Sequence, residues 1–272
     1  MKRNVETSGL VVVKIGGVAL SSQDTTFEDI VALQRRGLKL VVVHGGANIV
    51  NRWLEKQGTP TTFVQGERVT DRAALEMVTA VLAGLVNKEI VAAINCLGGR
   101  AFGLSGVDGA LLGASVRDEA MGFVGRIEAV AVAPLLALIE AGYVPVVAPI
   151  SLNLGREAGA PHMLNVNGDT VAGEIAAAIG AQKLIFLTDV AGILDGSGQL
   201  IKALSPEAAE ALIAAGVAKR GMIPKVRAGV RALSRGGIAR IVDGRRPHAL
   251  TGEIEGNLEG TTIRLPGYNI KR

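Results

Sequence analysis

The sequence predicts an α/β fold with a mainly parallel open sheet. Short apolar runs rich in Val, Ile and Leu alternate with helical patterns along almost the whole chain. These runs show little polar alternation, which is typical of strands covered on both faces. Two of them, Leu10–Ile15 and Leu38–His44, end in Gly-Gly before an amphipathic helical pattern. This order of strand, tight turn and helix is expected of neighbouring parallel strands.

The composition indicates a folded protein with a large aliphatic core. The chain has 272 residues, of which 49% are hydrophobic and 20% charged, so disorder is not expected. Aromatic residues make up only 3%, which argues against single-stranded nucleic-acid binding through stacked bases. The net charge of +4 suits an anionic small molecule as well as a polyanion. We interpret the basic residues Arg240, Arg245 and Arg246 as a solvated turn.

Cysteine usage and hydropathy predict a soluble, cytoplasmic protein. Cys96 is the single cysteine, so no internal disulfide can form, and its apolar neighbours predict a buried side chain. No run reaches the ~18 uninterrupted apolar residues that cross a bilayer. The N-terminus shows no signal-peptide pattern. We therefore expect neither membrane nor nucleic-acid partners.

The expected strands are apolar runs bounded by turn residues. In chain order they are Leu10–Ile15, Leu38–His44, Arg100–Leu104, Val144–Ala148, Lys183–Thr188 and Ile238–Val242. Helical periodicity predicts the segments between and after them. The expected helices are Thr25–Arg36, Ala47–Gln57, Asp71–Cys96, Ala133–Ala141, Asp169–Ile179, Pro206–Ala215 and Ile223–Arg235. Asp71 is the expected N-cap of the long third helix.

Short alternating stretches predict hairpins laid over the sheet. They lie near Pro60–Gly66, Leu111–Arg117, Gly122–Val130 and Ser151–Leu164. The clearest internal seam is Ile179-Gly180-Ala181, after which a fresh strand begins. We expect one domain over residues 1–272, with an N-terminal lobe of about 1–179 and a C-terminal lobe of about 180–272. Ligands of open parallel sheets bind beyond the carboxyl ends of the strands, so the site is expected there.

Several common catalytic motifs are absent from the sequence. It contains no GxxxxGK(S/T) loop, no GxGxxG after a strand, no HExxH, no CxxC pair and no GxSxG elbow. The histidines are His44, His162 and His248, and their positions support neither a His-based metal site nor a Ser-His-Asp arrangement. Cationic, amide and backbone groups near the strand ends remain as candidates.

The first glycine turns predict a site for an anion. Lys14 lies in an apolar strand that runs into Gly16-Gly17, and a buried ammonium group needs an anionic partner. Glycine lets backbone N–H groups approach phosphate oxygens, and a following helix N-terminus adds partial positive charge. The alternatives are a surface lysine and tight turns without a ligand. A pair of such turns, one of them carrying a lysine, favours the anion site.

Arg68 precedes the long third helix and is suited to a carboxylate. Its guanidinium can bind both carboxylate oxygens at once. The alternative is an ion pair with the neighbouring Glu67 or Asp71. These residues alone leave both interpretations open.

The segment Asn165-Val166-Asn167-Gly168-Asp169 places two amides on one face ahead of a helix. Asn167 or Asp169 is expected to cap that helix, which leaves Asn165 unexplained. A buried Asp169 could also hold two lysine ammonium groups in place. Lys225 stands in the first turn of another helix, where it opposes the helix dipole, so a negative group is expected beside it.

Taken together, these residues resemble the amino acid kinase family, and the resemblance runs from Val11 to about Ile263. It rests on the blocks Lys14-Ile15-Gly16-Gly17, His44-Gly45-Gly46, Gly66-Glu67-Arg68-Val69-Thr70-Asp71, Leu85-Val86-Asn87-Lys88, Asn165-Val166-Asn167-Gly168-Asp169, Thr188-Asp189-Val190-Ala191-Gly192-Ile193-Leu194 and Gly221-Met222-Ile223-Pro224-Lys225. The Arg-Val-Thr-Asp and Asn-x-Asn-x-Asp blocks are the most specific. They resemble the branch that phosphorylates N-acetyl-L-glutamate. The resemblance implies a three-layer αβα sandwich with a mainly parallel open sheet.

The resemblance implies an enzyme of arginine biosynthesis. Its reaction transfers a phosphoryl group from MgATP to the side-chain carboxylate of N-acetyl-L-glutamate, which gives N-acetyl-L-glutamyl 5-phosphate in the second step. A Glu-type carboxylate has a pKa of about 4.3 and is ionised at neutral pH, so no general base is required. The difficulty is the approach of one anion to another, which calls for positive charge and positioning.

The resemblance also implies roles for single residues. Lys14 and Lys225 are expected to neutralise the phosphoryl group in transfer, and Asp169 to orient both. Substrate binding is expected of Gly45, Gly46, Arg68, Asn165 and Asn167, with Arg68 on the α-carboxylate and Asn165 at the acetamido end. Nucleotide binding is expected of Gly16, Gly17, Asp189, Val190, Ala191, Gly192, Ile193, Leu194, Val217, Ala218 and Lys219. Mg²⁺ is expected to be held mainly by phosphates, so no metal ligands are assigned.

Two departures from the family pattern bear on the acceptor. Ala47 stands where many members have a third glycine, and Glu67 stands where an apolar residue is more usual. The closest rival is a kinase for aminoadipate or glutamate attached to an amino-group carrier protein. A non-catalytic nucleotide sensor and a nucleoside monophosphate kinase are further alternatives. Fewer than ten residues precede the first strand, so we expect a homodimer without strong arginine feedback.

Overall fold

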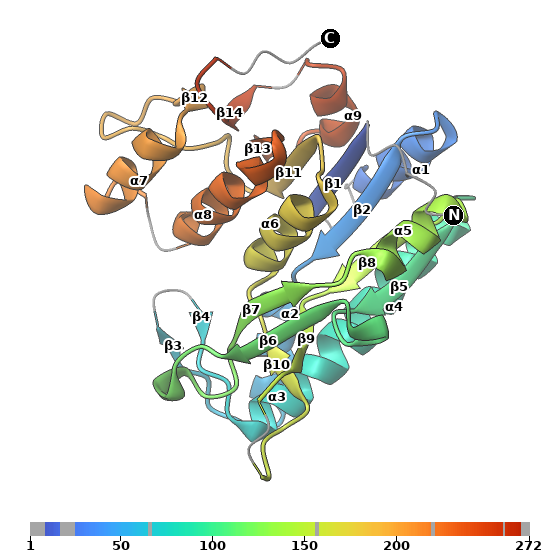
Figure 1. Ribbon diagram of the computed structural model, residues 1–272, viewed down its shortest axis with the longest axis vertical. Coiled ribbons are helices and arrows are strands. Elements are labelled where there is room, and N and C mark those ends of the chain that lie inside the picture. Colours follow the sequence, from blue (N-terminus) through green and yellow to red (C-terminus); the bar gives the residue numbers. More distant parts are fainter. Residues whose placement is uncertain are drawn as a thin grey trace.

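An eight-stranded sheet forms the centre of the molecule (Figure 1). The computed structural model describes residues 9–16, 25–64, 67–155, 158–218, 221–257 and 259–267. In spatial order the strands are β12 (Ala203–Leu204), β14 (Gly260–Ile263), β13 (Ile238–Asp243), β11 (Lys183–Thr188), β1 (Leu10–Ile15), β2 (Lys39–His44), β8 (Val144–Ala148) and β5 (Ala101–Ser105). Strands β13 and β14 pair antiparallel, and the other neighbours pair parallel.

The α/β fold with a mainly parallel sheet is therefore confirmed. Every strand predicted from the sequence is present, and β1, β8 and β11 have the predicted bounds. The short edge strand β12 and its neighbour β14 were not predicted.

Helices cover both faces of the sheet. One face carries α5 (Ala133–Glu140), α6 (Gly168–Ile179) and α8 (Met222–Ala232), with α7 (Pro206–Ala214) beside α8. The opposite face carries α1 (Thr26–Arg35), α2 (Ala47–Lys56), α9 (Ala249–Ile254) and the long helical stretch from Arg72 to Cys96. This is the expected three-layer αβα arrangement.

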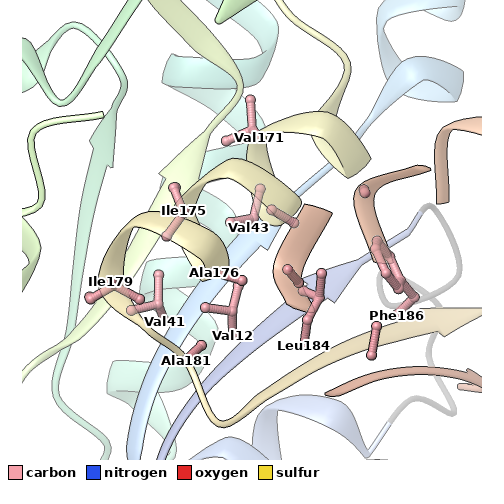
Figure 2. Close-up of a cluster of buried hydrophobic side chains, with 14 of the residues drawn as sticks. Val12, Val41, Val43, Val171, Ile175, Ala176, Ile179, Ala181, Leu184 and Phe186 are labelled. Carbon is pink, nitrogen blue, oxygen red and sulfur yellow. The ribbon is translucent and has the colours of Figure 1, made fainter. Parts of the chain in front are cut away.

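Alternate strand residues supply the two cores. Val12, Leu184 and Phe186 point to one face, where Figure 2 shows Val12 near Ala176 and other side chains of α6. Val11 and Ile185 point to the other face and join the core beneath α1 and α2. Because both faces are buried, the strands are continuous apolar runs in the sequence, although successive side chains point to opposite faces of the sheet.

A second sheet packs beside α6. Its strands, in order, are β10 (Met163–Asn165), β9 (Ile150–Asn153), β6 (Leu112–Val116) and β7 (Gly125–Val130). A separate two-stranded hairpin consists of β3 (Phe63–Val64) and β4 (Glu67–Arg68). These strands occupy the stretches where hairpins were predicted. Short 3₁₀ segments lie at η2 (Asp108–Ala110), η3 (Glu119–Met121) and η4 (Leu233–Arg235).

The long helical stretch has a π-helical middle. It consists of α3 (Arg72–Thr79), the π-helix η1 (Ala80–Val86) and α4 (Asn87–Cys96). Asp71 caps its start as predicted, accepting a hydrogen bond from Ala74 N at 2.8 Å. By length and composition alone this stretch, with a mean hydropathy of 1.7, could cross a membrane. One side of it packs in the core beneath the sheet through Val86, Ile90 and Ile94.

Two expectations about single residues are wrong. Cys96 is exposed, because it lies in the last turn of α4 on the side away from the sheet. Arg240 does not belong to a solvated turn: it lies in β13 and its guanidinium pairs with the buried Glu253. Glu253 also pairs with Lys183 Nζ at 3.1 Å.

Candidate active site

A cavity of about 530 Å³ opens at the carboxyl ends of β1, β2 and β11. The charged residues that line it are Lys14, Glu67, Arg68, Asp169, Asp189 and Lys225. Strand β1 has β2 on one side and β11, from much later in the chain, on the other. Such a reversal of strand order creates a crevice at the carboxyl edge, which is where ligands of open α/β sheets bind.

Lys14 and Lys225 share one buried carboxylate in this cavity. Lys14 Nζ lies 2.6 Å from Asp169 Oδ1, and Lys225 Nζ lies 2.9 Å from Asp169 Oδ2. Lys225 also donates to Gly221 O at 3.3 Å, within its own helical turn. The lysines come from β1 and α8, so residues from both ends of the chain meet on one side chain.

Close packing of α6 on α8 produces this meeting. A Cβ at Gly173 would lie 2.7 Å from Ala228 O, so only glycine allows the helices to cross this closely. Gly173 lies one turn after Asp169 on α6, and Ala228 lies about one turn after Lys225 on α8. The crossing therefore brings the beginnings of both helices together.

The ion pairs keep Asp169 charged. Burial alone would raise the pKa of this carboxyl, but the charges and hydrogen bonds of Lys14 and Lys225 outweigh it and lower the pKa below its ordinary value. The result is a fixed cluster with one negative and two positive charges. Its excess positive charge faces the cavity, where an anion could join the two lysines.

The turn after β2 brings backbone groups to the same place. A Cβ at Gly45 would lie 3.7 Å from Lys14 Nζ, so the main chain passes directly beside the ammonium group. Gly46 has φ +146°, and a Cβ there would lie 2.8 Å from Leu82 Cδ2. Both its backbone conformation and its space require glycine. Helix α2 begins at the next residue, with its N-terminus directed at the cavity.

Arg68 is buried in the cavity wall with unused hydrogen-bonding capacity. Its Nη2 donates to Asn51 Oδ1 and to Ala47 O, and its Cζ lies 4.9 Å from the centre of the Phe63 ring. Its Nη1 is buried and has no partner among the described residues. Burial lowers the pKa of Arg68 from its ordinary value. Neither Glu67 nor Asp71 pairs with it, so the alternative interpretation as an internal ion pair is wrong for this arginine.

Glu67 is neutralised by another arginine. Its carboxylate pairs with Nη1 of Arg117. Arg117 directly follows β6, so it approaches from the second sheet. The Glu67 side chain is 16% exposed and lines the cavity, whereas the Arg117 side chain is 37% exposed and lies at its outer side. The extra negative charge noted in the sequence therefore has a matching positive charge.

Asn165 and Asn167 both line the cavity, but they are held differently. Asn165 Nδ2 donates to Thr70 Oγ1 at 3.1 Å, which ties β10 to the segment before α3. Asn167 caps α6, because its Oδ1 accepts from Asp169 N at 2.8 Å and from Thr170 N at 3.3 Å. Capping therefore explains Asn167, as anticipated, and leaves Asn165 as the amide that lines the cavity without capping a helix.

The residues expected at the nucleotide are only partly gathered. Gly16 and Asp189 line the cavity, whereas Ile193 is buried in the core and its N–H donates to Thr261 Oγ1 at 2.8 Å. Val190 and Leu194 are exposed large apolar side chains on the segment after β11. The rest of the expected set comprises Ala191, Gly192, Val217 and Ala218, none of which lines this cavity. Gly17 and Lys219 lie outside the described residues.

The donor set does not suggest a protein-bound metal. Within the described ranges, no three His, Cys, Asp or Glu side chains cluster in a way that could hold a metal ion. Both oxygens of Asp169 already face lysine ammonium groups. A divalent cation at this site would therefore need most of its ligands from a bound phosphate.

Comparison with known proteins identifies the family. The sequence profile of the amino acid kinase family matches residues 9–243. The chain belongs to this family. The acetylglutamate kinase of Dehalococcoides mccartyi strain CBDB1 is 44% identical over 274 residues, which cover 100% of both chains. The acetylglutamate kinase of Thermosynechococcus vestitus is 47% identical over 251 residues, which cover 89% of this chain and 83% of the relative.

The solved structures agree on the fold. The crystal structure of smu.665 from Streptococcus mutans UA159 has a TM-score of 0.80 and 28% sequence identity. The similarity covers 94% of this chain and 98% of that chain. The central sheet and the flanking helices thus follow a shared arrangement.

Sequence reasoning missed Asn51, Phe63 and Thr70, which hold the predicted ligand-binding residues in place. A signal for Asn51 was present, since it lies one helical turn after Ala47 and so shares a face with the first residue of α2. No comparable local signal marks Phe63, whose contact with Arg68 depends on the pairing of β3 with β4.

Proposed function

We propose that this chain is an acetylglutamate kinase that transfers the γ-phosphoryl group of ATP to the side-chain carboxylate of N-acetyl-L-glutamate. The observation that carries the proposal is the pairing of Lys14 and Lys225 on buried Asp169, in the same cavity as buried Arg68. Full-length relatives of that name at 44% and 47% identity support it. They do not favour a carrier-protein-linked acceptor. The reaction is the second step of arginine biosynthesis.

The lysines supply the charge that the reaction needs. Two anions must approach each other, and in the transition state charge is spread over the oxygens of the phosphoryl group. Lys14 Nζ and Lys225 Nζ, fixed at 2.6 and 2.9 Å from Asp169, bracket the place where that charge develops. Because Asp169 already orients both ammonium groups, little reorganisation is needed during the reaction.

Arg68 and Asn165 provide the contacts for the acceptor. The unpartnered Nη1 of Arg68 is suited to the α-carboxylate, since a buried N–H without a partner is costly until an acceptor arrives. The amide of Asn165 is suited to the acetamido group. Gly46 offers its main-chain N–H group between these contacts and the lysines, whereas the Gly45 N–H already donates to Ile15 O at 3.0 Å.

No general base is needed, and His44 is not in a form that could act as one. The acceptor carboxylate has a pKa of about 4.3 and is ionised at neutral pH. His44 is buried, its pKa is lowered to about 4, and both ring nitrogens already have hydrogen-bonding partners. It is therefore a neutral structural group.

ATP fits as the phosphoryl donor, with Mg²⁺ carried on its phosphates. Gly16, Asp189 and the segment that follows β11 would border the nucleotide. A phosphate-bound Mg²⁺ would neutralise negative charge on the donor. The excess positive charge of the lysine cluster is matched to a polyphosphate.

A hydroxamate-trapping assay tests the proposal. Purified protein is incubated with MgATP, hydroxylamine and one acceptor: N-acetyl-L-glutamate, free glutamate or aspartate. An acyl phosphate is expected with N-acetyl-L-glutamate and not with the other two. Equal signal with free glutamate, or no signal with N-acetyl-L-glutamate, would contradict the proposed acceptor.

We also propose that the chain works as a cytoplasmic homodimer without strong arginine feedback. It would have an N-terminal lobe of about residues 1–179 for the acceptor and a C-terminal lobe of about 180–272 for the nucleotide. Strand β5 is at one edge of the central sheet and carries the exposed Phe102, which would suit contact with a second copy. Gel filtration should give twice the 28.0 kDa chain mass. A hexamer would contradict this proposal.

A further inference from the structure

A buried hydrogen-bond chain lies beneath the glycine turn that follows β2. Asn87, at the start of α4, has a fully buried side chain, and its Nδ2 lies 3.2 Å from His44 Nε2. On the other side of the ring, His44 Nδ1 lies 2.8 Å from Gly45 O. The chain therefore runs from a helix through an imidazole to the peptide that borders the cavity.

The direction of each hydrogen bond is fixed by its surroundings. Asn87 Nδ2 faces two carbonyl oxygens, Val146 O at 2.9 Å and Leu104 O at 3.4 Å, while Asn87 Oδ1 accepts from Lys88 Nζ at 3.1 Å. These partners set the orientation of the amide, so Nδ2 faces His44 as a donor and Nε2 must accept. Gly45 O can only accept, so the ring proton is on Nδ1.

This proton determines how the Gly45–Gly46 peptide is oriented. The described part of the chain has no cis peptide bonds, so the Gly46 N–H points away from the Gly45 carbonyl. Because the carbonyl is held toward the imidazole beneath the turn, the N–H is directed to the side of the cavity that Gly46 lines. A peptide turned the other way would present a carbonyl oxygen to an anionic ligand.

The charged groups around His44 keep the ring neutral. Lys14 on β1 and Lys88 on α4 both disfavour a positive imidazole. Asp169, at the start of α6, is the carboxylate that pairs with Lys14, and it is shared with Lys225. Burial is the largest effect and lowers the pKa of His44 to about 4.

The π-helix explains how Asn87 reaches this position. It is the residue directly after η1, the segment in which Leu82 packs against Gly46. π-helical segments are rare and are frequent at functional sites. Here the segment supports both halves of the turn, with Leu82 beneath Gly46 and Asn87 beneath His44.

We propose that Asn87 is a positioning residue for phosphoryl transfer, which fixes the Nδ1–H tautomer of His44 and thereby aims the Gly46 N–H at the anionic reactants. The inference rests on the proposed function for its reaction. It adds a residue that touches neither reactant and acts through the histidine and the glycine turn.

The test compares the wild type with Asn87→Asp and Asn87→Leu. In Asn87→Asp the carboxylate can only accept, so it draws the proton to Nε2 and leaves a lone pair on Nδ1 facing Gly45 O. We expect the ring ¹⁵N signals of His44 to change from the Nδ1–H to the Nε2–H pattern. The chain has 3 histidines, so this signal is assignable with His162→Gln and His248→Gln variants.

Kinetics give the second readout. An N–H aimed at developing charge contributes mainly in the transition state, and loss of one such donor costs about 10²–10³ in kcat. We expect a fall in kcat of at least about ten-fold, because the peptide is misaligned rather than removed. Both KM values should stay within about two-fold of the wild type. A protonated His44 can donate to both neighbours, so Asn87→Asp should regain activity as pH falls.

Asn95→Leu is the matched control. Asn95 lies on the same helix and likewise joins it to the main chain at the start of β5, through Ala101, without touching His44. It should leave the tautomer and kcat unchanged. Any one of three results would overturn the inference: an Nε2–H tautomer of His44 in the wild type, an unchanged kcat in both Asn87 variants, or an equal loss of kcat in Asn95→Leu. The tautomer is measured without substrate, and kcat is measured with whichever acceptor the wild type phosphorylates. Failure of the proposed acceptor can therefore be distinguished from failure of this inference.

Discussion

Replacing Asp169 by asparagine should destabilise the protein by about 3 kcal/mol and lower kcat at least ~100-fold. The Asp169 side chain is 6% exposed, and its carboxylate lies within 2.9 Å of both lysine nitrogens. Removing one member of a buried ion pair costs about 3–5 kcal/mol, because the remaining charge stays desolvated. The lower figure applies here because both lysines border a cavity that water can enter. The loss in kcat follows from lysines that are no longer aligned.

Thermal unfolding with and without MgATP measures the first effect. A loss of about 3 kcal/mol corresponds to a fall in Tm of about 6–12 °C for a chain of this size. A bound polyphosphate can take over the missing negative charge, so the deficit should shrink at saturating MgATP.

Glu253→Gln is the matched control. Glu253 is also buried between two cations, Lys183 and Arg240, but it lies near the amino end of β11, away from the cavity. This variant should also be destabilised, without rescue by MgATP and without loss of kcat in the folded protein. A wild-type kcat in Asp169→Asn, or an equal deficit with and without MgATP, would refute the reasoning.

Three further predictions follow from single contacts. Arg68→Ala should raise the KM for the acceptor by about 10- to 100-fold with a smaller change in kcat, and an unchanged KM would remove Arg68 from the pocket. Arg117→Ala should raise the same KM by several-fold at low salt, because Glu67 is then unpaired, and adding Glu67→Leu should reverse the effect. The unfolding free energy should fall by up to about 3 kcal/mol as pH drops from 6.5 to 4, since unfolded His44 takes up a proton that the folded ring, with its pKa of about 4, refuses. Urea unfolding of the wild type and His44→Gln checks it; parallel pH curves would contradict it.

The central strands could be predicted from sequence because one physical cause dominates them. Strands β1, β8 and β11 are buried on both faces, so their residues are mostly apolar. Each strand ends directly before a residue typical of turns, which marks its boundary in the sequence. The meeting of Lys14, Asp169 and Lys225 was also foreseeable, because each is a charged residue in a place that requires an opposite charge.

Other elements depend on contacts that no local pattern shows. Helix α9 has six residues, follows a left-handed His248, and is held by Asp29 of α1, which accepts from Leu250 N and Thr251 N at 3.1 Å. The periodicity of residues 71–96 predicts a helix but does not distinguish π from α geometry. The ion pair of Glu67 with Arg117 joins a hairpin to a different sheet, so only the tertiary structure shows it.

The π-helical segment makes this stretch of the chain intolerant of changes in length. Each residue added to or removed from a helix turns everything beyond it by about 100°. Between Ala80 and Val86, such a change would rotate α4 against α3, and Ile90 and Ile94 would leave the core while Leu82 kept its place beside Gly46. An insertion or deletion of a single codon would therefore disrupt either the wall of the cavity or the core beneath the sheet.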